Sequence, residues 1–155
     1  MQRYAVGFQQ HGVLPGDRVF VHLKNSADNL IAMYSCVLAG ATIVLAKTSL
    51  TEGELRYEAE DSDSTHVLTD EQYTGKVRKA VSNLSMKGLF CMGRSDGFVS
   101  ASMFSELDER EFQESPVADP RSTVMAVCYT SGTTGLPKGA EFTHYNFVSC
   151  FYSIR

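Results

Sequence analysis

The sequence lacks the features that mark several large classes of protein. Its 155 residues carry 14 Lys and Arg against 18 Asp and Glu, which gives a formal charge of -4. Without a basic excess, neither a nucleic acid nor an acidic membrane surface is expected as the main partner. The sequence also has no signal-peptide pattern and no apolar run long enough to cross a bilayer. These absences favour an intracellular protein, cytoplasmic or peroxisomal, with no transmembrane segment.

Cysteine and histidine are sparse and follow no ligand pattern. The four cysteines are widely spaced and form no Cys-x-x-Cys motif, which favours reduced and mostly buried thiols. Three histidines are scattered without the spacing of metal ligands: His11, His22 and His66. The sequence therefore predicts no metal site and assigns these histidines no catalytic role.

Hydrophobic residues make up 43% of the chain and charged residues 21%, which is enough for one globular domain with a core. Strand-like and helix-like segments alternate along it, and this order predicts an α/β fold around a mostly parallel sheet. Strands are predicted at 19–23, 42–46, 66–69, 89–92 and 124–129, the last ending at a buried Tyr129.

Side chains suited to capping precede the predicted helices. They are Asn25 or Ser26, Thr51 with Glu54 in a capping box, Asp70 and Thr143. The acidic runs at 58–61 and 106–111 are predicted to be solvated faces. The polar segment 93–119, with a helical turn around Met103, Phe104 and Leu107, is predicted to be a surface connection.

The most informative segment is Tyr-Thr-Ser-Gly-Thr-Thr-Gly-Leu-Pro-Lys-Gly at 129–139, directly after an apolar strand. Its glycines allow close backbone approach, and its hydroxyls, amides and lysine can bind anionic oxygens. The candidate phosphate-binding residues are Thr130, Ser131, Gly132, Thr133, Thr134, Gly135, Lys138 and Gly139. A Walker A loop is excluded, because no Ser or Thr follows a Gly-Lys pair at the required spacing. The alternative is a plain Gly/Thr surface turn.

This segment resembles the AMP-binding signature of the adenylate-forming superfamily, which includes acyl-CoA synthetases, coumarate-CoA ligases, luciferases and peptide-synthetase adenylation domains. Weaker resemblances lie at 11–19, 38–41 and 50–55, in the same order as in the family. Two departures occur after the second predicted strand. Lys47-Thr48 stands where the coumarate-CoA ligase branch usually has Asn-Pro, and the Asp-Pro-x-Tyr-Pro element of peptide synthetases is absent. The acyl-CoA side of the superfamily is therefore favoured.

The resemblance implies that residues 1–155 form part of a large N-terminal AMP-binding domain, incomplete at both ends and without the C-terminal domain. It implies an ATP-dependent acid-CoA ligase, which activates a small-molecule carboxylic acid as acyl-adenylate, releases pyrophosphate and transfers the acyl group to coenzyme A. ATP, Mg2+ and coenzyme A are the implied cofactors and co-substrates. No catalytic residue is identifiable, and the 155 residues alone are expected to be inactive. A luciferase-like monooxygenase and a non-catalytic truncated product stay open.

The family also has a Thr-His-x-Asn element after the loop, which matches Thr143, His144 and Asn146. His144 is therefore a secondary candidate for ligand contact. The favoured interpretation is structural, with Thr143 as the N-cap and His144 in the first turn of a helix.

Overall fold

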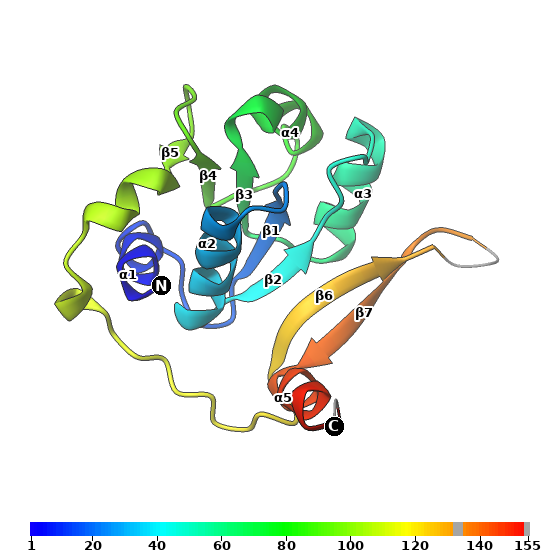
Figure 1. Cartoon of the computed structure of the whole chain (residues 1–155). Helices are drawn as coiled ribbons and strands as arrows, with labels where there is room; N and C mark the ends of the chain where they lie inside the picture. The colour runs from blue at the N-terminus through cyan, green and yellow to red at the C-terminus, as the bar shows by residue number, and fades with distance from the viewer. Residues whose placement is uncertain (132–134, 154–155) are drawn as a thin grey trace.

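The computed structural model describes residues 1–131 and 135–153, and these form a seven-stranded sheet with helices on both faces (Figure 1). The strands are β1 (Arg18–His22), β2 (Thr42–Leu45), β3 (His66–Asp70), β4 (Gly88–Met92), β5 (Val99–Ser100), β6 (Val124–Thr130) and β7 (Lys138–Thr143). The α-helices are α1 (Gln2–Gln10), α2 (Ala27–Leu38), α3 (Glu52–Asp61), α4 (Thr74–Ala80) and α5 (His144–Ser153). Short 3-10 turns are η1 (Glu71–Tyr73), η2 (Ala101–Glu106) and η3 (Glu109–Glu111).

The strand order is β5-β4-β3-β1-β2-β6-β7, and every neighbouring pair is parallel except β6 and β7. The predicted α/β fold with a mostly parallel sheet is confirmed. Because β1 lies between β2 and β3, the chain first adds a strand on one side of β1 and then on the other. Ligands of such sheets bind outside the carboxyl ends of the strands, which is where β6 delivers the glycine-rich segment.

Apolar side chains fill a layer on each face of the sheet. Between α1, η2 and the sheet, the rings of Phe8, Phe90 and Phe104 meet edge to face with centroids 5.1 to 6.2 Å apart. On the opposite face, Leu55 of α3 and Val77 of α4 are buried against the sheet. Burying side chains of this size contributes roughly 1.5–3 kcal/mol each.

Of the four predicted helix caps, one is wrong and three are confirmed, including that of Thr143, which is described with the candidate site. Ser26 accepts a hydrogen bond from the amide of Asn29, and Thr51 forms the predicted capping box with Glu54. Asp70 caps nothing with its side chain. Its carboxylate accepts instead from the Lys24 amide at 2.7 Å and from Asn29 Nδ2 at 2.9 Å. The parallel pairing of β1 and β3 brings these groups together, which no local sequence pattern shows.

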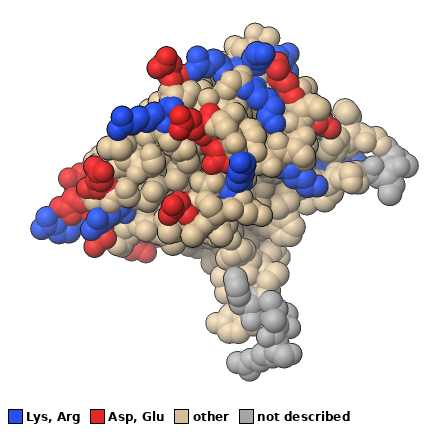
Figure 2. Space-filling view, turned by 45° about the horizontal axis from the view of Figure 1, so that its top comes forward, with Lys and Arg blue, Asp and Glu red and all other residues tan. Residues whose placement is uncertain are grey.

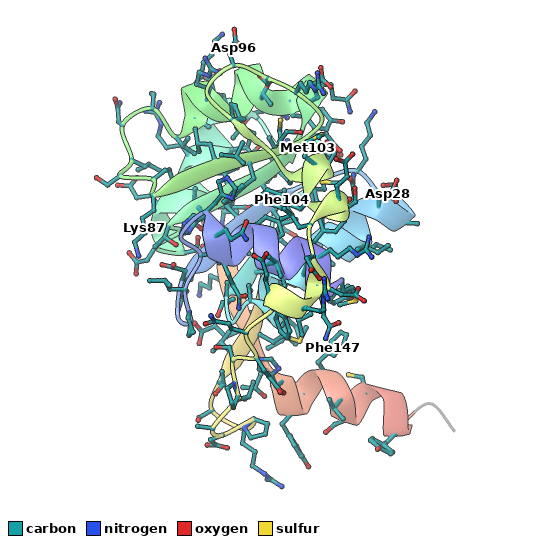
Figure 3. All side chains as sticks on the ribbon, turned by 90° about the vertical axis from the view of Figure 1, so that its left-hand side faces the viewer. Asp28, Lys87, Asp96, Met103, Phe104 and Phe147 are labelled. Atoms are coloured by element: carbon teal, nitrogen blue, oxygen red, sulfur yellow. The ribbon has the colours of Figure 1, made fainter. Side chains whose placement is uncertain are left out.

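The prediction that 93–119 is only a surface connection is also wrong in part. Within η2, Ala101 and Phe104 are buried, whereas Met103 is exposed. Figure 3 shows Phe104 directed toward α1. A Cβ placed on Gly7 of α1 would lie 2.2 Å from Phe104 Cγ, so the ring occupies the space that a larger residue at 7 would need. Ala101 and Phe104 of η2 therefore belong to the core, while most of residues 105–119 are exposed, as predicted.

Gly7 and Gly53 are both helical, and they offer a direct test of this packing. Gly7→Ala should destabilise the protein by about 1–3 kcal/mol, because the new methyl group overlaps the Phe104 ring. Gly53→Ala, where nothing lies within 4 Å, should instead stabilise it by up to about 1 kcal/mol. Urea unfolding of both variants measures the difference, and a gain in stability for Gly7→Ala would contradict the proposed contact.

Candidate functional site

The glycine-rich segment connects β6 to β7 at the tip of an antiparallel hairpin (Figure 1). Strand pairing continues to the base of the loop, where Tyr129 pairs with Gly139 and Thr130 with Lys138. The strand β7 was not predicted. The hairpin therefore places the first and last polar residues of the loop directly opposite each other.

Of the eight candidate phosphate-binding residues, five lie in the described part of the chain. Thr130, Ser131 and Lys138 are exposed at the mouth of the hairpin, and the Thr130 hydroxyl lies 3.5 Å from the Lys138 carbonyl oxygen. Gly135 has a φ of +144°, a conformation that side chains disfavour. The other candidates, Gly132, Thr133 and Thr134, lie outside the described residues.

Gly139 has a packing role besides any contact with phosphate. A Cβ at this position would lie 3.0 Å from Val127 Cγ1 and 3.3 Å from Tyr129 Cζ. Glycine therefore lets the Tyr129 ring lie across the hairpin. Tyr129 and Cys128 are half-buried rather than buried, because β6 leaves the protection of the sheet at this end.

His144 is not close to the loop. It begins α5, behind an N-cap in which the Thr143 hydroxyl accepts from the Asn146 amide at 3.2 Å. The favoured structural interpretation of this element is confirmed. Because β7 has six residues, roughly 20 Å separate the two ends of this strand. His144 thus lies at the amino end of β6, where burial lowers the pKa of its imidazole.

Helix α3 contacts both arms of the hairpin beside the loop. The Tyr129 hydroxyl donates to Asp61 Oδ2 at 2.6 Å and lies 3.2 Å from the Glu58 carbonyl oxygen. The Tyr57 hydroxyl donates to the Pro137 carbonyl oxygen at 3.0 Å. Burial and the neighbouring Asp61 carboxylate both raise the pKa of Tyr129, so its hydroxyl keeps its proton. The sequence pattern did not indicate these residues as part of the site.

The prediction that 58–61 is a solvated acidic face is wrong for Glu58. Its side chain is only 4% exposed, and its Oε2 has no hydrogen-bond partner in the described structure. Burial raises the pKa of Glu58 to about 7; the Glu54 charge adds to this shift and Lys47 opposes it. Glu60 and Asp61 are exposed, as predicted.

A cavity of about 550 Å³ lies next to the loop, at the carboxyl ends of β1, β2 and β6. The residues that line it include Lys24, Asn29, Lys47 and Thr48, apolar residues such as Leu30 and Met33, and Tyr129 of the hairpin. Elsewhere, as Figure 2 shows for one face, basic and acidic side chains are interspersed. The cavity and the loop together form a site with cationic and hydroxyl groups at the edge where parallel sheets bind ligands.

Several other features bear on the composition-based predictions. All four cysteines are free: Cys36 and Cys91 are buried, Cys128 is half-buried and Cys150 is exposed. Among residues 1–131 and 135–153, no three His, Cys, Asp or Glu side chains are grouped so that they could hold a metal ion. None of the described helices is long and apolar enough to cross a membrane.

Comparison with protein families matches residues 1–155 to the family described as AMP-binding enzyme. The chain belongs to the AMP-binding enzyme family. The match covers the sheet, the hairpin and its loop, so the family assignment includes the candidate site. The resemblance noted from the loop sequence is confirmed.

Known relatives agree with this assignment. A 4-coumarate–CoA ligase of Humulus lupulus is 30% identical over 149 residues, which are 96% of this chain and 27% of the relative. A long-chain-fatty-acid-CoA ligase structure from Archaeoglobus fulgidus superposes with a TM-score of 0.85 at 26% identity, covering 96% of this chain and 29% of that one. The structure of a luciferase-like enzyme of Zophobas morio superposes with a TM-score of 0.86 at 22% identity, covering 98% of this chain and 36% of that one. At this identity, the likeness shows the fold alone. The chain spans about a quarter of the length of the curated relatives it matches.

The buried Glu58 makes the stability of the protein depend on pH. Its pKa is raised in the folded state, so folding favours the protonated form, and stability should fall as pH rises from about 4.5 through about 7. Glu58→Gln keeps the shape but cannot ionise. As the pH rises between these values, we expect the melting temperature of the wild type to fall by a few degrees more than that of Glu58→Gln. Glu60→Gln, at an exposed position, is the control and should behave as the wild type.

Proposed function

We propose that this chain supplies the phosphate-binding part of an ATP-dependent acid-CoA ligase. The enzyme activates a carboxylate as acyl-adenylate with release of pyrophosphate, and then transfers the acyl group to coenzyme A. The observation that carries the proposal is the loop 129–139, which closes a β-hairpin at the carboxyl edge of the sheet with Thr130, Ser131 and Lys138 exposed at its mouth. The ligase names of the relatives support the same reaction class.

The loop's work in this reaction is electrostatic. Negative charge grows on the departing pyrophosphate as the carboxylate attacks the α-phosphorus, and Lys138 with the loop hydroxyls would stabilise it. Mg2+ would enter as part of the Mg–ATP substrate. No described observation favours a luciferase-like reaction over thioester formation. We expect residues 1–155 alone to form no acyl-adenylate, because they span about a quarter of the length of the relatives.

Binding of inorganic tripolyphosphate with Mg2+ tests the site on the 155-residue chain itself. Lys138→Ala should weaken this binding by about tenfold or more, through loss of a charge-assisted contact. Lys79→Ala, which removes an exposed lysine from α4, is the matched control and should bind as the wild type. Calorimetric titration provides the measurement. Equal affinities in all three proteins would place the binding site elsewhere.

The two half-reactions separate the role of Lys138 from a general effect on the fold. In an enzyme that contains this chain and catalyses both, Lys138→Ala should slow adenylation by roughly 30- to 1000-fold. Thioester formation from preformed acyl-adenylate should change much less, because the β- and γ-phosphates have left before the thiol attacks. Each step is measured in single turnover. An equal loss in both would show that the lysine does not act on the departing pyrophosphate.

A further inference from the structure

The sheet supports the hairpin only up to the start of the loop. The residues of β6 that pair with β2 are Ala126, Val127 and Cys128, so this lateral pairing ends one residue before Tyr129. From Tyr129 onward, the described backbone of the hairpin pairs only between its own strands, β6 and β7. A two-stranded ribbon without a third strand is marginally stable, so the tip requires another support.

Helix α3 provides this support on both arms. On the arm that enters the loop, the Tyr129 hydroxyl donates to the Asp61 carboxylate at 2.6 Å, a charge-assisted hydrogen bond. On the arm that leaves the loop, the Pro137 carbonyl oxygen accepts from the Tyr57 hydroxyl at 3.0 Å. The two tyrosine rings meet edge to face, with centroids 6.4 Å apart and planes at 73°. The residues on either side of the loop are thus tied to one helix.

Further contacts hold α3 in place against the hairpin. Arg18, at the start of β1, donates to the Ser62 carbonyl oxygen at 3.1 Å and pairs with Glu141 of β7 at 3.2 Å. Gly139 leaves the space into which the Tyr129 ring fits. The position of α3 is therefore coupled to both strands of the hairpin, and not only to the residues that flank the loop.

We propose that Tyr57, Asp61 and Tyr129 are positioning residues that clamp the phosphate loop to α3. This inference rests on the proposed function, since the purpose of the clamp is to hold the loop for a polyphosphate. Tyr57 contacts the Pro137 carbonyl oxygen of the hairpin, and Asp61 contacts the hydroxyl of the hairpin residue Tyr129. Any effect of the three residues on the reaction therefore passes through the loop. The Tyr129 ring packs against the apolar layer that includes Leu55 and Val127, so a substitution that removes only its hydroxyl keeps this packing.

Tyrosine-to-phenylalanine substitutions test the clamp, since they remove one oxygen and keep the ring. The proteins are the 155-residue chain, Tyr57→Phe, Tyr129→Phe, the double variant, and Tyr152→Phe as the matched control. Tyr152 is 73% exposed on α5. Hydrogen exchange at the Ser131, Gly135 and Leu136 amides reports on the loop. Calorimetric titration with Mg–tripolyphosphate reports on binding, and amides of β1 and β3 report on the fold.

The double variant should exchange its loop amides about tenfold faster and bind tripolyphosphate about tenfold more weakly, with unchanged exchange in β1 and β3. Tyr152→Phe should match the wild type in all three. Asp61→Asn keeps a hydrogen-bond acceptor at position 61. Its loop exchange rate and its affinity for tripolyphosphate should therefore lie between those of the wild type and Asp61→Ala.

Unchanged loop exchange and unchanged affinity in the double variant would overturn the clamp while leaving the phosphate site intact. Faster exchange spread equally over β1 and β3 would also overturn it, since that result marks a general loss of stability. If the wild type binds no tripolyphosphate, the proposed function fails. The clamp as a device for holding a phosphate loop then fails with it, even where loop exchange responds as expected.

Discussion

The parallel pairing of β6 with β2 is the interaction on which the rest of the site depends. Three consecutive pairs, from Ile43 with Ala126 to Leu45 with Cys128, place β6 at the side of the sheet with its carboxyl end facing the same edge as β1 and β2. The loop that follows therefore opens beside the cavity at that edge. The apolar layers above and below the sheet hold the strands in this register, and the hairpin extends the last of them beyond the sheet.

Beyond Cys128, the hairpin is held by side-chain contacts with α3 rather than by pairing with β2. Tyr57, Asp61 and Tyr129 join α3 to the hairpin, and Gly139 makes the room that this requires. A catalytic group that is misplaced by about 1 Å can lose much of its effect, so a loop that handles phosphates benefits from such second-layer support. The buried Glu58 belongs to the same helix, and its raised pKa predicts that the stability of the protein falls as its carboxyl group ionises.

The sequence predicted the features that depend on local chemistry. Alternating strands and helices and the caps at Ser26 and Thr51 follow from short-range patterns, and they are present in the structure. The loop sequence predicted the family, which is confirmed, whereas its binding of phosphate stays a prediction. It did not predict β7, whose residues are mostly exposed and include a glycine, so that no buried stripe marks the strand. Asp70 and Glu58 were misassigned because their surroundings come from segments distant in sequence. The clamp could not be predicted for the same reason, since 68 residues separate Asp61 from Tyr129.

The central claim, that the hairpin tip binds polyphosphate at the carboxyl edge of the sheet, is tested most directly by backbone amide NMR during titration with Mg–ATP. The expected result is a set of shift changes concentrated at 130–139, with smaller changes in the adjoining cavity at Lys24, Lys47 and Thr48. Residues at the opposite edge of the sheet, including His144 directly after β7, should not respond. Changes centred at His144, or spread evenly over the surface, would contradict the assignment of the loop as the phosphate site.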